Sequence, residues 1–258
     1  MYPVDLQGKY AMVFGVANHK SIAWAIAQAL RQAGARLAIT YQDERLRERV
    51  VKLTEGWDAV LLLECDVTKD ADIAAAFQAV KDHAGGLSVV VHSVAFALRE
   101  ELGGDFSQTS RDGFKTALDI SAYSLIPIAR YAAPLMEPEG GSIVTLTFIA
   151  SERVFPGYNV MGTAKAALEN EVKQLAAELG QKGIRVNALS PGPLDTLAAR
   201  GIHGFLDMKR GYSERAPLGR NNTHEEVAKA ALFLCSDLAS GVTGVILPVD
   251  AGYHIMAV

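Results

Sequence analysis

The sequence has little of several features that mark particular classes of protein. It contains 2 cysteines in 258 residues, Cys65 and Cys235, and they fit no metal-ligand spacing. Its 6 histidines form neither an H-E-x-x-H motif nor a cluster. Its 25 basic and 29 acidic side chains are interspersed and leave a net charge of -4, without the basic field of nucleic-acid binders. We expect two reduced cysteines, no protein-bound metal and no nucleic-acid partner.

Long apolar runs are also missing. No stretch of about 18 uninterrupted apolar residues occurs, as a membrane-spanning helix would need. The N-terminal sequence MYPVDLQGKYAMVFGVA lacks the basic leader and the long apolar core of a signal peptide. These absences predict a protein that has no membrane contact and resides in the cytoplasm.

Short runs rich in Val, Ile and Leu alternate with helical patterns along the whole chain. YAMVFGVA precedes SIAWAIAQALRQAG, and AVLLLECDV precedes KDADIAAAFQAVKDHAG. Continuous apolar runs indicate strands buried on both faces, as in parallel sheets. The alternation predicts an α/β protein with a doubly wound Rossmann-type domain, in which helices flank a mainly parallel seven-stranded sheet. We expect one dinucleotide-binding and catalytic domain over residues 1–258, with a substrate-binding insertion at about residues 191–220, where the pattern is least regular.

The loops after the first and third predicted strands are candidates for binding a dinucleotide. The first strand ends at Gly15, and the next helix opens near Ser21. Open α/β sheets bind ligands beyond the carboxyl ends of their strands, where a helix N-terminus offers amides to a pyrophosphate. The G-x-G-x-x-G fingerprint is absent, so a plain turn with Ser21 as N-cap is the alternative. After the third strand, Asp66 and Val67 are placed to meet adenine, or Asp66 is a turn residue or N-cap.

The end of the second predicted strand bears on the choice of cofactor. Rossmann-type sites place a group here that meets the adenosine ribose, an acid for NAD or a cation for a 2′-phosphate. Gln42 can hydrogen-bond a ribose hydroxyl, and the carboxylates of Asp43 and Glu44 would repel a phosphate. Arg45 and Arg47 lie close by and weaken this argument. The stretch favours NADH over NADPH.

The stretch FPGYNVMGTAK places Tyr158 seven residues before Lys165. The whole chain resembles the short-chain dehydrogenase/reductase superfamily, whose standard catalytic set is a Ser at the end of strand five, a Tyr four residues before a Lys, and that Lys. The matching positions here are Phe148, Met161 and Lys165, so the lysine alone agrees with the standard set.

These departures together resemble one branch of the superfamily, the bacterial enoyl-[acyl-carrier-protein] reductases. The resemblance covers about residues 5–256 and rests on SIAWAIA after Gly15, TYQ, CDV, HSVAFA, DISAYS, YNVMGTAK and VDAGYHI. It implies a homotetramer that reduces the trans-2 double bond of enoyl thioesters with NADH in the last step of the fatty-acid elongation cycle. Two alternatives stay open: a superfamily member acting on a carbonyl or alcohol, and a nucleotide-binding regulator without turnover.

The resemblance implies roles for three residues near the reacting bond. Tyr158 would donate a hydrogen bond to the developing enolate oxygen. Lys165 would hold the nicotinamide ribose, and its charge would lower the pKa of a nearby tyrosine. Phe148 occupies the position of a second tyrosine found in most bacterial members, and without a hydroxyl it can act only by packing against substrate or nicotinamide.

The displaced tyrosine also has a geometric explanation. In conjugate reduction hydride reaches C3 while charge develops on the thioester oxygen, three bonds away. The hydroxyl must then lie farther from the nicotinamide than in carbonyl reduction. Moving its attachment from position 161 back to Tyr158 displaces it by about 4.5 Å if both positions lie on one helix.

The resemblance further implies where cofactor and substrate lie. Besides the residues named above, it assigns to the cofactor Ile22, Ser93, Val94, Ala95, Leu194, Thr196 and Ala198. It assigns to the acyl substrate Tyr158, Phe96, Ala97, Met161, Ile202, Phe205 and Met208. The apolar members of this second set would serve equally well as core, since any helix has an apolar face. The carboxylate of Asp195 is unfavourable near a pyrophosphate unless it points away.

The expected protein partner is an acyl carrier protein, which is acidic. Cations in the segment that would face it are confined to Arg200, Lys209 and Arg210. The carrier is therefore expected from the resemblance more than from these residues, and a coenzyme A thioester is the alternative substrate.

Overall fold

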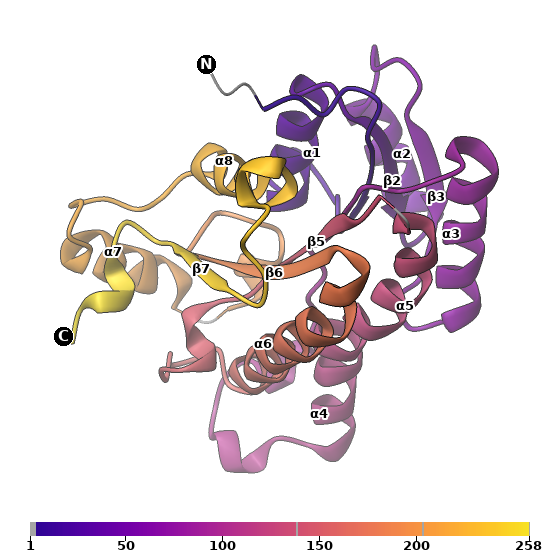
Figure 1. Ribbon diagram of the computed structural model, residues 1–258. Coiled ribbons are helices and arrows are strands. Elements are labelled where there is room, and N and C mark those ends of the chain that lie inside the picture. Colours follow the sequence, from indigo (N-terminus) through magenta and orange to yellow (C-terminus); the bar gives the residue numbers. More distant parts are fainter. Residues whose placement is uncertain (1–3, 138, 203, 258) are drawn as a thin grey trace.

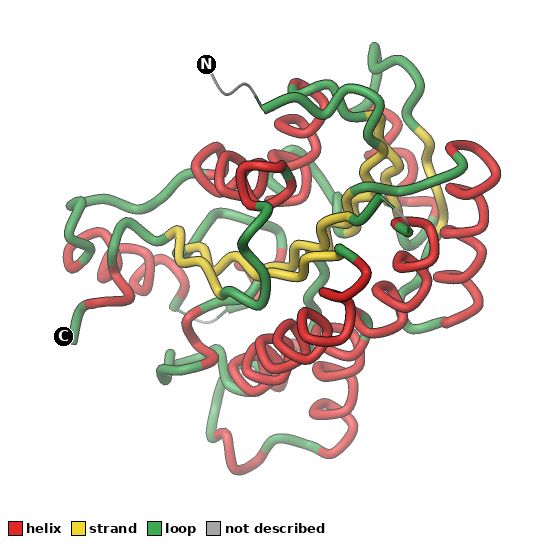
Figure 2. Tube along the Cα trace, viewed as in Figure 1, coloured by secondary structure: helices red, strands yellow, loops and turns green. Residues whose placement is uncertain are grey.

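The seven strands found among the described residues form one parallel sheet. The computed structural model describes residues 4–137, 139–202 and 204–257. The strand order is β3-β2-β1-β4-β5-β6-β7, and each neighbouring pair is parallel (Figures 1 and 2). The strands are β1 Tyr10–Phe14, β2 Arg36–Tyr41, β3 Leu61–Glu64, β4 Val89–His92, β5 Gly141–Leu146, β6 Ile184–Pro191 and β7 Ile246–Val249. The predicted doubly wound α/β fold is confirmed.

Helices cover both faces of the sheet. They are α1 Ile22–Gln32, α2 Glu44–Leu53, α3 Asp70–Ala84, α4 Arg111–Leu118, α5 Leu125–Met136, α6 Val160–Leu179, α7 Phe205–Arg215 and α8 His224–Cys235. Buried side chains of α1 and α8 belong to one of the two large core clusters, and those of α3, α5 and α6 belong to the second. Figure 1 accordingly shows α8 and α6 on opposite sides of β5 and β6. A π-helix, Asp119–Tyr123, joins α4 to α5.

Side chains at alternating positions of a strand pack into one or the other of these two large clusters. Met12 packs into the cluster beneath α3, α5 and α6, whereas its neighbours Ala11 and Val13 pack into the cluster beneath α1 and α8. All three are fully buried. Burial stabilises by about 1.5–3 kcal/mol for a fully buried Val or Met side chain. The continuous apolar runs in the sequence follow from this two-sided burial.

The segment around the displaced tyrosine differs from the prediction. Helix α6 begins at Val160, so Tyr158 lies in the turn that precedes it. The 4.5 Å displacement, which holds only if both positions lie on one helix, therefore does not apply to Tyr158. Strand β5 ends at Leu146, two residues before Phe148.

Both cysteines are free and buried. Burial raises the pKa of Cys65 and of Cys235 to about 12, so both thiols stay protonated at neutral pH. Within the described residues, no helix combines the length and the apolar character needed to cross a membrane.

Candidate active site at the carboxyl edge of the sheet

Gly15 closes β1 where the backbone of β4 comes close. Its φ is +95°, and a Cβ at this position would lie 1.9 Å from the carbonyl oxygen of Ser93. Residues with a side chain rarely adopt this φ, and none fits beside that carbonyl. One glycine therefore suffices to let the β1–α1 loop pass over the end of β4, although the longer glycine fingerprint is absent.

Ser21 holds this first loop together. Its Oγ accepts hydrogen bonds from the backbone amides of Ala17 at 3.0 Å and Asn18 at 3.1 Å. Ser21 stands at the N-cap of α1, but its side chain accepts no bond from the helix. The N-cap alternative was thus wrong for the side chain, which closes the loop. Ile22 then begins α1 at the carboxyl end of β1, where helix amides can face a pyrophosphate.

The charges after β2 are largely committed to the protein itself. Asp43 is the N-cap of α2, and its carboxylate accepts a bond from the amide of Leu46 at 2.8 Å. Glu44 pairs with Arg47 at 2.8 Å, so these two charges offset one another. Gln42 is exposed at the end of β2, free to meet a ligand.

Asp66 serves a local turn after β3. Its Oδ1 accepts from the amide of Thr68 at 3.1 Å and from the Thr68 hydroxyl at 2.8 Å, and Lys69 lies 3.6 Å from its other oxygen. These bonds support the turn alternative for Asp66. Its half-buried neighbour Val67 packs against the core. The backbone of Asp66 and Val67 therefore lies just beyond the carboxyl end of β3.

Lys165 is buried behind the carboxyl end of β5. It is 4% exposed, and its Nζ donates to the carbonyl oxygen of Leu146, the last residue of β5, at 2.7 Å. Burial lowers the pKa of Lys165 to about 8, while the carboxylate of Glu169 opposes the shift. Glu169 itself accepts from the Thr147 hydroxyl at 2.6 Å. The cation is therefore held in place, with donor capacity left for a ligand.

Tyr158 lies between two apolar clusters beside the same strand end. One contains Val160 and Met161, and the other contains Phe148, whose ring centroid is 5.1 Å from that of Tyr158. Burial raises the pKa of Tyr158. The expected lowering by Lys165 is not found: burial alone accounts for the direction of the pKa shift, and the ammonium group donates to the carbonyl of Leu146. The phenol is therefore a neutral donor.

The turn that carries Tyr158 is constrained from both sides. Asn159 has a φ of +34°, unusual for a residue with a side chain, and its amide donates to the carbonyls of Gly103 at 2.9 Å and Gly104 at 3.3 Å. A Cβ at Gly162 would lie 2.8 Å from the carbonyl oxygen of Ala150. A strained backbone of this kind persists where its surroundings hold it. Here the bonds of Asn159 and the close contact at Gly162 hold the start of α6.

Ser121, which the sequence alone did not single out, organises the substrate side. Its Oγ accepts from the amide of Phe96 at 2.9 Å and donates to the carbonyl of Phe96 at 3.0 Å. It also lies 3.7 Å from the sulfur of Met161. Ala97 packs with Met161, as predicted for the substrate side, whereas the Phe96 side chain is 48% exposed. The motif DISAYS contains this serine, but its partner is visible only in the fold.

His92 is a second residue that sequence reasoning missed. It is fully buried at the end of β4, where its Nδ1 lies 2.8 Å from Thr145 Oγ1 and its Nε2 lies 2.9 Å from Ser124 Oγ. Burial, aided by the charge of Lys165, lowers the pKa of His92 to about 3. The neutral ring therefore joins β4, β5 and the start of α5 beneath the site.

The remaining predicted residues follow β4 and β6. Val94 packs against the core, and Ala95 is exposed after it. Leu194 is buried, Ala198 is exposed, and the hydroxyl of Thr196 accepts from the amide of Ala199 at 3.1 Å. Leu194, Thr196 and Ala198 follow β6, whereas Val94 and Ala95 follow β4; both segments lie at the carboxyl edge of the sheet, consistent with a cofactor site there.

The predicted acyl-binding residues do not form one cluster. Met208 packs against the cluster of Phe148, Ile149 and Tyr212, against which Tyr158 packs as well. Ile202 and Phe205 are half-buried and belong to none of the core clusters among the described residues. Met208 therefore has the best structural support for contact with an acyl chain.

Asp195 points toward α7. Its Oδ2 lies 2.9 Å from Nζ of Lys209, and this hydrogen bond holds the pKa of Asp195 below its usual range, with Lys20 and His224 contributing. The negative charge near the cofactor loop is thereby offset. Because Lys209 is paired, the basic patch expected at the pocket mouth is thinner still; the side chain of Arg200 lies outside the described part of the chain, and Arg210 is exposed.

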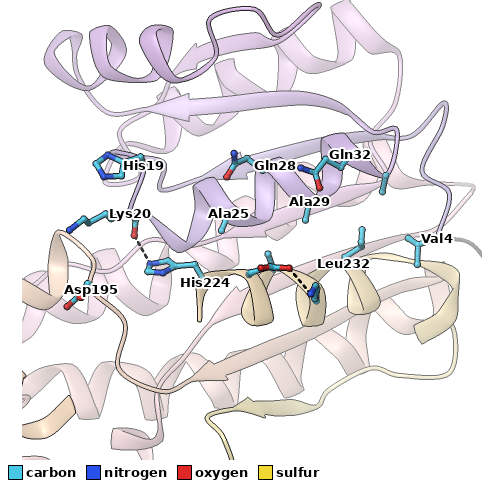
Figure 3. Close-up of a pocket in the computed structure, with 14 residues that line it drawn as sticks. Val4, His19, Lys20, Ala25, Gln28, Ala29, Gln32, Asp195, His224 and Leu232 are labelled. Carbon is cyan, nitrogen blue, oxygen red and sulfur yellow. Dashed lines mark hydrogen bonds and ion pairs between the residues drawn. The ribbon is translucent and has the colours of Figure 1, made fainter. Parts of the chain in front are cut away.

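A groove of about 880 Å³ lies between α1 and α8, apart from Tyr158 and Lys165 (Figure 3). One end is lined by Lys20, Asp195 and His224, and the other by Val4 and Leu232. The carbonyl of Lys20 lies 2.9 Å from Nε2 of His224, which joins the first loop to α8. The polar end adjoins the loops assigned to the cofactor, whereas Tyr158 and Lys165 do not line the groove.

These features define the class of protein. The lysine bound to the last carbonyl of β5 and the tyrosine packed just beyond it lie at the edge where open parallel sheets bind nucleotides. That arrangement is the one expected of a short-chain dehydrogenase/reductase.

Comparison with known proteins narrows the class to one family. The family model described as enoyl-(acyl carrier protein) reductase matches residues 15–254. The NADH enoyl-[acyl-carrier-protein] reductase FabI of Bacillus cereus is 53% identical over 254 residues, covering 97% of this chain and 98% of that protein. The corresponding protein of Nostoc sp. is 52% identical, covering 98% and 99%. The chain belongs to the enoyl-(acyl carrier protein) reductase family.

Solved structures agree with this assignment. The Bacillus cereus enoyl-acyl carrier protein reductase, crystallised with NADP+ and indole naphthyridinone, superposes with a TM-score of 0.96 at 51% identity and covers 98% of this chain and 100% of its own. The Anaplasma phagocytophilum reductase in complex with NAD gives a TM-score of 0.94 at 45% identity, covering 98% and 96%. The family predicted from the sequence motifs is confirmed.

Proposed function

We propose that this family member reduces the trans-2 double bond of enoyl thioesters with NADH, in the last step of the fatty-acid elongation cycle. The observation that carries the proposal is the arrangement of Tyr158 and Lys165 at the end of β5, with Met161 in place of the standard tyrosine. The names of the relatives supply the cofactor and the thioester carrier.

The chain's residues fit a nicotinamide dinucleotide. The close approach of Gly15 to Ser93 requires a residue without a side chain at the start of the first loop, where a pyrophosphate would lie. Lys165 has the position and charge to hold ribose hydroxyls. NADH, when bound, supplies the hydride. Gln42 can meet a ribose hydroxyl, and Glu44 offsets the charge of Arg47, so that of the two nearby arginines only Arg45, which is exposed, lies outside this pair.

Tyr158 performs the electrostatic part of the reaction. Because burial raises its pKa, the phenol stays protonated and donates a hydrogen bond to the oxygen on which charge develops. Its apolar surroundings strengthen that bond, since the local dielectric constant is low. Phe148 brings no hydroxyl, so it acts by packing against Tyr158 and the substrate.

The insertion at residues 191–220 supplies the substrate side in this proposal. Met208 on α7 and Met161 on α6 face Tyr158 from its two clusters. We assign Ile202 and Phe205 to the far end of the acyl chain. An acyl carrier protein is the proposed thioester carrier, a homotetramer the proposed assembly, and the cytoplasm the proposed location.

One assay tests the proposed activity. NADH and NADPH oxidation are followed separately with a crotonyl thioester on coenzyme A and on acyl carrier protein, beside an acetoacetyl thioester. The expected result is turnover of the crotonyl thioester with NADH. Turnover of the ketone without the enoyl substrate would identify a carbonyl reductase, and turnover of neither would favour a regulator.

A further inference from the structure

The side chain of Tyr212 connects α7 with the aromatic rings around Tyr158. It is 2% exposed, and its ring stacks on Tyr253 with centroids 3.6 Å apart and planes at 15°. The same ring lies 6.3 Å from Phe148 and 6.0 Å from Phe155. Since Phe148 lies 5.1 Å from Tyr158, a shift of Tyr212 reaches Tyr158 through one intervening ring.

Several buried polar atoms lie beneath these rings without a hydrogen bond. Within the described residues, no partner is found for the hydroxyl of Tyr212, for either side-chain amide atom of Asn222, or for Oδ1 of Asn221. Asn222 is 6% exposed. Buried polar groups in folded proteins are almost always paired, with protein or with ordered water. These atoms therefore call for a partner that is itself polar and small.

Two side chains that carry unpaired atoms, Asn222 and Tyr212, both lie against Gly192, the residue after β6. A Cβ there would lie 2.5 Å from Asn222 Oδ1 and 3.3 Å from Tyr212 Cε1, so those two atoms are at most 5.8 Å apart. The ring of Tyr212 and the amide of Asn222 are therefore close neighbours, and a water can bridge polar groups of neighbouring side chains that have no direct bond. The nearby Asp250 carboxylate already accepts bonds from the amides of Gly252 at 3.0 Å and His254 at 2.8 Å.

We propose that Tyr212 Oη and the side-chain amide of Asn222 hold one buried water, and that this hydrated contact makes Tyr212 a positioning residue for Tyr158. A buried water needs two to four polar partners, and a phenol with an amide supplies both donors and acceptors. The adjacent Asn221 donates from Nδ2 to the carbonyl of Lys209 at 3.1 Å. Asn221 thus holds α7 through the backbone of Lys209. One turn further along the helix, Asn222 holds it through the water and Tyr212.

The chain's last turn completes this contact from the other side. Arg153 donates to the carbonyl of His254 at 2.6 Å and also to that of Met256, so the turn carrying Tyr253 is fixed. Figure 1 shows this end of the chain beside α7. The ring of Tyr212 is thereby held between Tyr253 and the hydrated amide. The water site stands independently of catalysis, whereas the positioning role rests on the reductase function proposed above.

A crystal structure of the protein with NAD⁺ tests the water site directly. The expected result is one ordered water within hydrogen-bond distance of Tyr212 Oη and of an Asn222 amide atom. A direct bond between the two side chains would overturn the site, and so would the absence of ordered solvent between them. Neither outcome depends on turnover.

Paired variants test the positioning role. Tyr212→Phe removes the hydroxyl and keeps the ring, and Asn222→Leu removes the amide at similar volume. Each is expected to raise the KM for the enoyl thioester about fivefold, with the KM for NADH unchanged, and the double variant is expected to match the single ones. Tyr123→Phe, which alters a tyrosine that is 43% exposed, is the matched control.

Two results would overturn the role. One is an unchanged thioester KM in Tyr212→Phe; the other is a fully additive loss in the double variant, in KM and in the urea midpoint of unfolding. If the unmodified protein reduces no enoyl thioester, the proposed function fails. The urea midpoints of the same variants and the crystal structure still decide the water site in that case.

Discussion

The ring of Phe148 lies 5.1 Å from the ring of Tyr158, at an interplanar angle of 54°. Phe148 is 8% exposed, and Phe155 and Tyr212 pack on it as well. Tyr158, the proposed hydrogen-bond donor, is thus supported by an aromatic cluster instead of by a second hydroxyl. Its geometry depends on packing, and its pKa is raised by burial.

Tyr158→Phe is expected to remove the donor while preserving the fold. The thioester oxygen would then lose one aligned hydrogen bond at the stage when its charge develops. The kcat should fall about 10²- to 10³-fold with little change in the KM for NADH. Steady-state kinetics measure both constants. A kcat within threefold of the unmodified protein would show that another group stabilises the oxygen.

Phe148→Tyr is expected to change the chain-length profile. A new hydroxyl at this buried position either meets the substrate or remains unpaired among aromatic rings, and in the second case it costs about 1–3 kcal/mol of stability. Rates with C4 to C16 enoyl thioesters and the urea midpoint of unfolding measure both effects. Phe155→Tyr is the control, because Phe155 packs on Phe148 and its substitution leaves position 148 as it is. An unchanged profile would exclude Phe148 as a determinant of specificity.

Lys165 gives the cofactor-free protein a characteristic pH dependence. Burial lowers its pKa from 10.5 to about 8, so between these values the unfolded chain binds more protons than the folded one. The contribution of Lys165 to stability is unfavourable below pH 8, and stability rises as the pH increases from 8 to 10.5. Lys165→Met should remove this rise, on the order of 3 kcal/mol.

Urea unfolding at several pH values between 7 and 10.5 measures the difference between the two proteins. Taking the difference matters, because the raised pKa values of Cys65 and Cys235 lower stability over the upper part of the same range in both proteins. A difference that does not vary with pH would mean that Lys165 titrates normally in the folded state.

Gly15→Ala is expected to disrupt the first loop. The new Cβ meets the carbonyl of Ser93 at 1.9 Å and the φ of +95° is unfavourable, so we expect a loss of about 2–4 kcal/mol together with weaker NADH binding. Gly56→Ala is the matched control, since its φ is +78° but nothing lies within 4 Å of its Cβ. Similar losses in both variants would assign the effect to φ strain and not to the contact with Ser93. Thermal unfolding and NADH fluorescence titration provide the measurements.

The fold could be predicted because its signal is local. Two-sided burial leaves continuous apolar runs, such as that around Met12 and Val13, and these runs alternate with helices in the order that a doubly wound sheet requires. The identity of Tyr158 and Lys165 as a pair was predicted from their spacing and from the motifs around them. The start of α6 at Val160 was not, because it depends on the close approach of Gly162 to Ala150.

The supporting residues could not be predicted for a related reason. Ser121 acts on Phe96, and His92 acts on Thr145 and Ser124, across separations of 25 to 53 residues. No periodicity records such pairings, since they exist only once strands and helices have been placed side by side. The role of Asp195 likewise depended on Lys209, a partner on another element.

Arg153 fixes the backbone of His254 and Met256, and Tyr253 of the same turn stacks on Tyr212, so this turn at the end of the chain packs on the aromatic cluster against which Tyr158 also lies. An affinity tag fused there would be attached within a few residues of groups that set the geometry of Tyr158. Kinetic constants are therefore best compared on protein carrying its tag at the N-terminus, because the described chain begins at Val4, beside the groove between α1 and α8 (Figure 3).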